Sequence, residues 1–305
     1  MKGNIEKLIR HPLLRGLIRL SGFRLSRSIL YYTIARCLIP RKVVLSLLAS
    51  VRLYFPRYLE ENEGAAIRER ARQYIRHYKM KLCEDIVILN QSRRAIPKVI
   101  AANVEIKGME NFDRAMDAQR GVLAVGSHVG SVIWGTVALV QCANSVPSAR
   151  HRFISICTDP YAGRFFPPGG HQDRYAFIPN DLDPPRMIER ILAALHAGQI
   201  VTTNLDVLSG GASTRVFPLF GTAEVFLPAV VGAAKIAKAS EAVVLPWSNR
   251  RDERGRLVLS FEQPFAPDGA TSALSARLRD LLEKWIRESP EQWIYWDRFH
   301  KRLLN

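Results

Sequence analysis

The chain of 305 residues is 48% hydrophobic and 24% charged, and its formal net charge is +16. This length can bury a sizeable core in one large α/β domain, or in one domain with a helical extension. Four scattered cysteines form no C-x-x-C pair, which argues against a disulfide framework and against a structural zinc site: Cys37, Cys83, Cys142 and Cys157.

The basic charge is concentrated in the N-terminal part of the chain. Residues 1–60 contain twelve Lys and Arg against two Glu, whereas residues 101–305 carry a net charge of only +2. The basic residues alternate with large apolar ones, but no charge-free window reaches the ~20 residues that a membrane-spanning helix needs. We expect a cationic amphipathic helix that lies in the lipid headgroup region.

Two other interpretations of this N-terminal pattern remain open. The helix can instead pack on the main domain and expose its arginines to water. Nucleic-acid binding is the other possibility, but no nucleic-acid motif accompanies the charge, and basicity alone is weak evidence. We therefore predict a basic, helical, membrane-associating region over residues 1–100.

From residue 101 onward, short apolar segments alternate with segments of helical periodicity. This alternation predicts an α/β domain over residues 101–305, with a mainly parallel sheet flanked by helices. The predicted strands are 102–108, 122–127, 152–157, 199–206, 241–248 and 256–263, and the predicted helices are 110–121, 131–142, 185–198, 227–239 and 274–290.

One long connection interrupts this alternation. Residues 158–185 contain six prolines and three glycines, and we expect them to be irregular. A connection of this length in a compact domain usually serves a function, such as covering a substrate.

The stretch 121–135, "GVLAVGSHVGSVIWG", carries the first candidate for chemistry. His128 follows a predicted buried strand directly and precedes a helix, where a catalytic base can sit. No Asp or Glu occurs between residues 121 and 150. The chain also lacks the P-loop, G-x-G-x-x-G, H-E-x-x-H and G-x-S-x-G motifs, so nucleotide-binding, metalloprotease and hydrolase functions gain no support.

Three segments carry a resemblance to a known family. The segment "VEIKGMENFDRAMDAQRGVLAVGSHVGS" resembles the start of the lysophospholipid-acyltransferase-like fold. More narrowly, it is similar to the branch of the lipid A late acyltransferases and the mycobacterial mannoside acyltransferases. Residues 199–265 follow that family's order of strand, Asp, loop, F-F-G, helix and strands. The end, "SPEQWIYWDRFHKR", resembles its P-x-Q-W-x-W-x-x-R-x-K signature.

The resemblance implies an acyltransferase. The family moves an acyl chain from acyl carrier protein or a coenzyme A thioester to a hydroxyl on a membrane lipid or glycolipid. His128 matches the family's general base and Gly130 its glycine, whereas Ser131 stands where Asn is common. Ile133 occupies the position of the acid in the H-x4-[DE] motif.

The missing acid leaves three explanations. A carboxylate can arrive from elsewhere in the fold, and Asp206 or Asp159 are the candidates because the carboxyl ends of parallel strands converge; Glu224 is a weaker one. Alternatively, the acceptor is an amine, which needs less help from a base. In the third explanation the protein no longer catalyses and only binds a lipid or a carrier protein.

Several other residues are candidates for binding. Arg215, Arg250 and Arg251 can hold an acceptor phosphate or the phosphopantetheine of a carrier, although solvated arginines are an equal interpretation. We expect Phe220, Trp293 and Trp296 to pack in the core. We predict no metal, no cofactor and no nucleic-acid partner, and we expect a peripheral location on the cytoplasmic face of the inner membrane.

Overall fold

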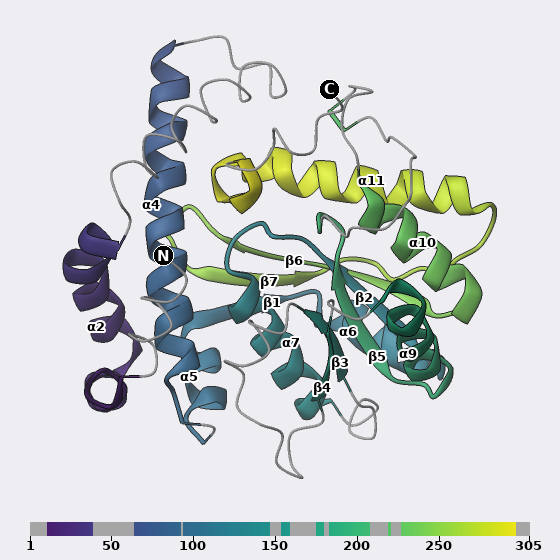
Figure 1. The fold of residues 1–305 in the computed structure, drawn as a ribbon, viewed down its shortest axis with the longest axis horizontal. Coiled ribbons are helices and arrows are strands. Elements are labelled where there is room, and N and C mark those ends of the chain that lie inside the picture. Colours follow the sequence, from purple (N-terminus) through teal and green to yellow (C-terminus); the bar gives the residue numbers. More distant parts are fainter. Residues whose placement is uncertain are drawn as a thin grey trace.

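The computed structural model describes residues 11–38, 64–92, 94–146, 154–158, 175–179, 183–207, 219–220 and 227–296. In this part of the chain, a seven-stranded sheet is flanked by helices on both faces (Figure 1). The strands are β1 (Val104–Lys107), β2 (Val122–Gly126), β3 (Ile154–Thr158), β4 (Tyr175–Pro179), β5 (Ile200–Asn204), β6 (Val243–Arg251) and β7 (Leu257–Phe261).

The helices are α2 (Pro12–Leu38), α4 (Gly64–Leu89), α5 (Ile96–Asn103), α6 (Met109–Asp117), α7 (Val132–Ser145), α9 (Pro184–His196), α10 (Pro228–Ser240), α11 (Thr271–Glu288) and the short 3-10 helix η2 (Pro290–Gln292). The predicted α/β class with a mainly parallel sheet is confirmed. The strand order is β1-β7-β6-β2-β5-β3-β4, and the β6–β7 hairpin is antiparallel while the other pairs are parallel.

Strand β2 lies near the centre of the sheet, between β5 and β6, and all five of its residues are buried. Its side chains alternate between two cores, as the period of two in a strand requires. Val122 and Ala124 belong to the core formed with α6 and α7, whereas Leu123 and Val125 belong to the core formed with α10 and α11. Burial on both faces explains why the sequence of this strand is continuously apolar.

The prediction of an irregular segment over residues 158–185 is wrong in part. Residues Tyr175–Pro179 form β4, which pairs in parallel with β3 at the edge of the sheet. An edge strand tolerates proline because one side of its backbone is not needed for pairing. The many prolines of this segment led to the prediction of a loop where β4 forms. Residues 159–174 and 180–182 lie outside the described residues.

The N-terminal helices pack against the α/β domain. Ile18, Phe23 and Leu30 of α2 are buried in the same core as residues of α4 and α7. The Phe23 ring meets the Trp134 ring of α7 edge-on, with centroids 4.6 Å apart. Figure 1 shows α2 and α4 side by side, at one end of the strands. The two regions predicted from the sequence thus share one apolar core.

Helix α2 also exposes an apolar face. Its backbone is non-helical at Gly22, where φ is 71°. Beyond its buried side chains, it exposes six large apolar ones to solvent: Leu13, Leu17, Leu20, Leu25, Ile29 and Tyr32. None of the helices in the described ranges is long and apolar enough to cross a membrane.

Candidate active site

The loop that carries His128 begins where β2 ends. Strands β2 and β5 pair in parallel, with Gly126 opposite Asn204, so the residues that follow both strands emerge side by side. Asp206 follows β5 just as His128 follows β2. The parallel register therefore brings together two side chains that are 78 positions apart in the sequence.

His128 and Asp206 are in direct contact. The Nδ1 atom of His128 lies 2.7 Å from Oδ1 of Asp206, and the backbone N–H of His128 donates to Oδ2 at 2.8 Å. The indole N–H of Trp293 donates to the same Oδ2, also at 2.8 Å. The Asp206 carboxylate is completely buried, and a buried charge requires partners of this kind.

This contact defines the tautomer of the imidazole. A carboxylate only accepts hydrogen bonds, so the proton of the neutral ring lies on Nδ1 and the lone pair on Nε2. The hydroxyl of Tyr295 lies 3.3 Å from Nε2, and the two rings are tilted with centroids 4.7 Å apart. The His128 side chain remains 17% exposed. An oriented imidazole with a lone pair near the surface has the arrangement of a general base.

The C-terminal segment holds the His128 loop from the other side. The backbone N–H of Gly130 donates to the carbonyl of Gln292, and the N–H of Ile294 donates to the carbonyl of His128. Gly130 has a φ of 71°, and a Cβ there would collide with the carbonyl oxygen of Asn249. Only glycine fits this close approach without strain.

Two aromatic residues of this segment contact the His128–Asp206 pair, and the sequence alone does not indicate these contacts. Trp293 was expected to pack in the core, and it is fully buried, but it also donates to Asp206. The sequence pattern makes no prediction for Tyr295, whose hydroxyl lies 3.3 Å from Nε2 of His128. Their signal in the sequence was the P-x-Q-W signature, which marks the segment without showing what its side chains contact. Trp296 is fully buried and its ring stacks on that of Phe220, so the structure places both in the core.

Ser131 has a structural partner on another element. It precedes the first turn of α7, and its hydroxyl donates to Oδ1 of Asp85 on α4 at 2.9 Å. The side-chain amide of Asn249 donates to the carbonyl of Ser131. Ile133, the residue predicted to stand at the position of the family's acid, packs against the apolar core as a partly buried side chain. The acid contact to His128 thus comes from the segment after β5 and not from α7.

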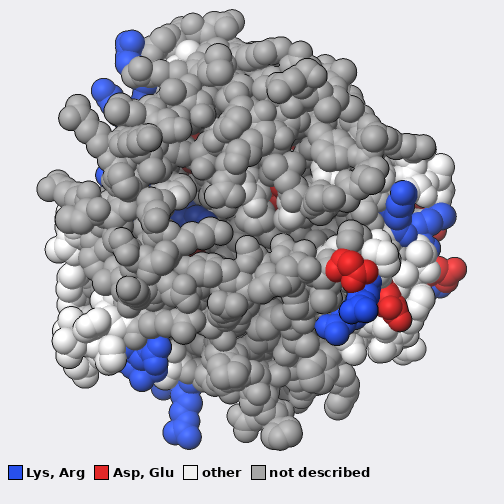
Figure 2. Space-filling view, in the orientation of Figure 1, with Lys and Arg blue, Asp and Glu red and all other residues white. Residues whose placement is uncertain are grey.

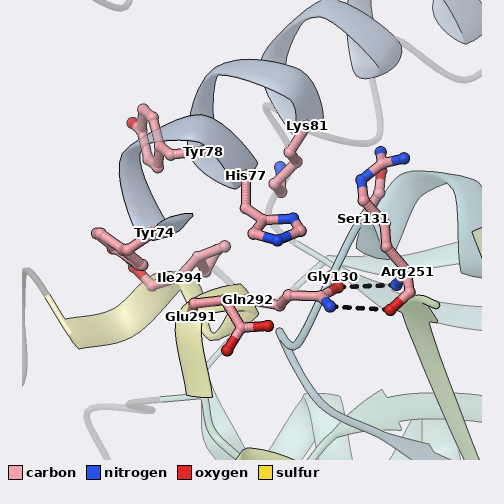
Figure 3. Close-up of a pocket in the computed structure, with 10 residues that line it drawn as sticks. All are labelled: Tyr74, His77, Tyr78, Lys81, Gly130, Ser131, Arg251, Glu291, Gln292 and Ile294. Atoms are coloured by element: carbon pink, nitrogen blue, oxygen red, sulfur yellow. Dashed lines mark hydrogen bonds between the residues drawn. The ribbon is translucent and has the colours of Figure 1, made fainter. Parts of the chain in front are cut away.

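A small pocket lies beside Gly130 and Ser131, and Figure 3 shows its lining. Its cavity volume is about 10 Å³, which is the space of roughly one water molecule. The side chain of Gln292 spans one wall and forms two hydrogen bonds, of 2.8 and 3.0 Å, with the backbone of Arg251 (Figure 3). The pocket is too small for an acyl chain.

Arg251 is an interior residue, which removes it from the candidates for binding a phosphate. Its guanidinium is 4% exposed and forms an ion pair with the fully buried carboxylate of Glu84 on α4. Arg27 of α2 pairs with the other oxygen of Glu84 at 3.3 Å. Burial, with the nearby charges of Arg27 and Arg76, lowers the pKa of Arg251 to about 9.

The other predicted site residues do not join this cluster. Arg250 points to the surface, where it forms an ion pair of 2.5 Å with Glu288 of α11. Arg215, Asp159 and Glu224 lie outside the described residues. Among the candidates of the sequence, the structure brings His128, Asp206, Gly130 and Ser131 to one end of the sheet.

His77 on α4 predicts a pH dependence of stability. Its partly buried ring lines the small pocket beside Arg251, and burial, followed by the charges of Arg251 and Arg76, lowers its pKa to about 4. Between pH 6.5 and 4 the unfolded chain therefore binds a proton that the folded protein does not. The stability from neutral His77 is complete above pH 6.5 and is lost as the pH falls towards 4.

We expect the native protein to lose about 2 kcal/mol more stability than His77→Gln between pH 7 and pH 5. Urea unfolding of both proteins at the two pH values measures this difference. Carboxylates elsewhere titrate equally in both proteins and cancel in the comparison. Equal losses in the two proteins would show that His77 accepts a proton in the folded state.

A comparison with protein-family models finds a match that covers most of the chain. A search of curated proteins finds no match. A family model described as bacterial lipid A biosynthesis acyltransferase matches residues 27–305, a range that includes the whole sheet and the His128–Asp206 contact. The chain therefore belongs to the bacterial lipid A biosynthesis acyltransferases, a family of membrane-associated enzymes that transfer acyl chains to a lipid acceptor.

Proposed function

We propose that this protein transfers an acyl chain from a thioester donor to a hydroxyl of a membrane lipid or glycolipid, with His128 as the general base. The observation that carries the proposal is the contact between His128 and the buried carboxylate of Asp206. The donor is acyl carrier protein or coenzyme A. Acyl carrier protein is acidic, so the basic N-terminal region suits its approach.

The reaction needs one group that accepts the proton of the acceptor hydroxyl and later gives this proton to the leaving thiolate. Nε2 of His128 takes the proton of the acceptor hydroxyl while the hydroxyl oxygen bonds to the thioester carbonyl carbon. Asp206 holds the ring by Nδ1 and stabilises the imidazolium that forms. The carbon–sulfur bond then breaks, and the departing thiolate takes the proton back from Nε2. Atoms and charge balance without another reactant.

The amine acceptor and the non-catalytic role were alternatives that followed from the missing acid. Asp206 supplies a carboxylate contact to His128 although Ile133 stands in the usual position. No described residue favours either alternative over the hydroxyl acceptor, and hydroxyl transfer is the reaction we test.

We further propose that residues 1–100 attach the enzyme to the cytoplasmic face of the inner membrane. Support comes from α2, where Leu13, Leu17 and Leu20 are 73%, 64% and 88% exposed on one side of the helix. Apolar side chains flanked by arginines are typical of helices that lie in the headgroup region. In Figure 2, the described Lys and Arg atoms at the left edge have no Asp or Glu atoms beside them, whereas both signs mix at the right.

Acyl transfer from a labelled acyl carrier protein tests the proposed function. The assay compares the native protein, His128→Ala and the control His196→Ala, whose side chain is exposed on α9. We expect transfer to a glycolipid hydroxyl by the native and control proteins and none above background by His128→Ala. Equal transfer by all three proteins, or none by the native protein with any hydroxyl or amine acceptor, would contradict general-base catalysis by His128.

A further inference from the structure

A second pocket lies away from the His128–Asp206 pair, between three elements of the described chain. Its volume is about 500 Å³, and its walls come from α2, from the junction of α5 and β1, and from the turn between β6 and β7. This turn follows the carboxyl end of β6, so the pocket opens at the same end of the sheet as His128. Pockets of this size accommodate small ligands or headgroups.

Four arginines line this pocket, and we call it the arginine pocket: Arg24, Arg27, Arg254 and Arg256. Glu105 is the one carboxylate in its lining. Arg27 is paired with Glu84, and Arg256 with Asp252 and Glu105. Arg24 and Arg254 have no acidic partner among the residues that the structure describes, so within this part of the chain two guanidinium groups lack a counter-charge.

The turn that carries two of these arginines is held in a defined shape. Asp252 accepts a hydrogen bond from the backbone N–H of Arg256 to its Oδ1, at 2.8 Å, and its own N–H donates to the Arg256 carbonyl. Gly255 takes a φ of 74°, and its carbonyl accepts from the guanidinium of Arg251 at 3.1 Å. A turn fixed by its own bonds presents Arg254 and Arg256 without a large ordering cost.

The chemistry of the lining indicates a phosphate ligand. One guanidinium group can donate two parallel hydrogen bonds to the oxygens of a phosphate, and it is more weakly hydrated than an ammonium group. Arginine is therefore favoured over lysine for binding phosphate. Small apolar residues complete the wall, among them Ala101, Ala102 and Val104. A phosphate with an uncharged body, such as a glycerol or sugar moiety, matches a lining that combines guanidinium groups with small apolar side chains.

The position of the pocket relates it to both the membrane and the reaction site. Arg24 and Arg27 lie on α2, the helix with the exposed leucines. The carboxylate of Glu84 joins Arg27, at the arginine pocket, to Arg251, beside Gly130 and Ser131. We propose that the arginine pocket binds the phosphate group of a phosphorylated ligand, either a lipid headgroup or a soluble phosphate ester. This binding requires no catalysis by His128.

The test uses the full chain and a double variant, Arg24→Gln/Arg254→Gln. Both side chains are exposed and have no described acidic partner, so we expect their loss to leave folding intact. The control is Arg114→Gln/Arg190→Gln, which removes two exposed charges from α6 and α9, outside the lining of the pocket. Equal ionic strength and matched thermal midpoints keep the comparison fair.

Two probes distinguish the source of the phosphate. Calorimetry with glycerol 3-phosphate measures a soluble ester, and sedimentation with phosphatidylcholine vesicles, with and without phosphatidic acid, measures a headgroup. We expect the double variant to bind one or both probes at least ~10-fold more weakly, because hydrogen bonds to charged groups are lost. A loss with vesicles alone assigns a lipid headgroup, a loss with glycerol 3-phosphate alone assigns a soluble ester, and a loss with both assigns the shared phosphate.

Two results would overturn the proposal: an equal loss in the control variant, or affinities of the double variant within about twofold of the native protein for both probes. The His128→Ala protein is measured beside them and should bind like the native chain. If the acyl-transfer assay fails, the phosphate-binding result therefore remains valid. If the phosphate-binding assay fails, the proposed acyltransferase function is not affected.

Discussion

Asp206→Asn lowers kcat for acyl transfer by about 10⁴-fold while the protein stays folded. The magnitude follows from serine proteases, where the same change to the partner of the catalytic histidine has this effect. The side chain keeps its shape, so packing changes little. The substitution changes the hydrogen-bond donors and acceptors that residue 206 presents to His128.

The surrounding hydrogen bonds dictate how the new amide is oriented. Oδ2 of Asp206 accepts from the backbone N–H of His128 and from the indole of Trp293, so the amide oxygen must remain at that position. The amide NH₂ then faces Nδ1 of His128, where Oδ1 accepts at present. Because NH₂ only donates there, Nδ1 must carry the lone pair and the proton moves to Nε2. The base thus loses the lone pair on the side of Tyr295.

Steady-state transfer assays measure the effect, with Asp117→Asn, an exposed site on α6, as the matched control. Circular dichroism and the thermal midpoint show whether the fold is retained. The double variant Asp206→Asn/His128→Ala should be no slower than His128→Ala, because residues that act as a unit are not additive. If Asp206→Asn retains more than a tenth of the native kcat, Asp206 does not orient the base.

Glu84→Gln destabilises the protein by about 3–5 kcal/mol, the cost of removing one partner of a buried ion pair. The Glu84 carboxylate is completely buried and pairs with Arg27 and Arg251. Glutamine keeps the volume but not the charge, and the guanidinium of Arg251, 4% exposed, is then left without its counter-charge. Arg251 also holds Gln292 through its backbone, so the segment of Trp293 and Tyr295 should loosen as well.

Urea unfolding at pH 7 measures this loss. The control is Glu69→Gln on the same helix, where an exposed pair with Arg72 should contribute less than about 1 kcal/mol. Adding Arg251→Met to Glu84→Gln removes the unpaired cation and should restore part of the lost stability. A loss below about 1 kcal/mol in the single variant, or no recovery in the double variant, would contradict the role of this ion pair.

Local patterns in the sequence were sufficient to predict most of the fold. Short segments with apolar residues in continuous or alternating positions indicated six of the seven strands, and helical periodicity indicated the helices between them. These signals work because burial of a strand or a helix face depends on side-chain spacing within a few residues. Strand β4 was missed because its apolar residues lie among prolines and glycines, which normally indicate loops.

The candidate site divides in the same way between sequence and structure. His128 was identified from its position directly after a buried strand, and Asp206 was one of several possible partners. Only the parallel register of β2 and β5 decides that Asp206 lies against Nδ1. Trp293 and Tyr295 join them through the packing of the C-terminal segment, for which residue type gave no indication.

The sequence by itself determined the α/β class, the order of most elements and the histidine at the end of the central strand, because these depend on short-range periodicity. The tertiary structure alone decided which carboxylate meets that histidine, that Arg251 lies inside, and that arginines from two distant segments share a pocket. Such contacts depend on strand order and helix packing, which bring together residues that no local pattern relates.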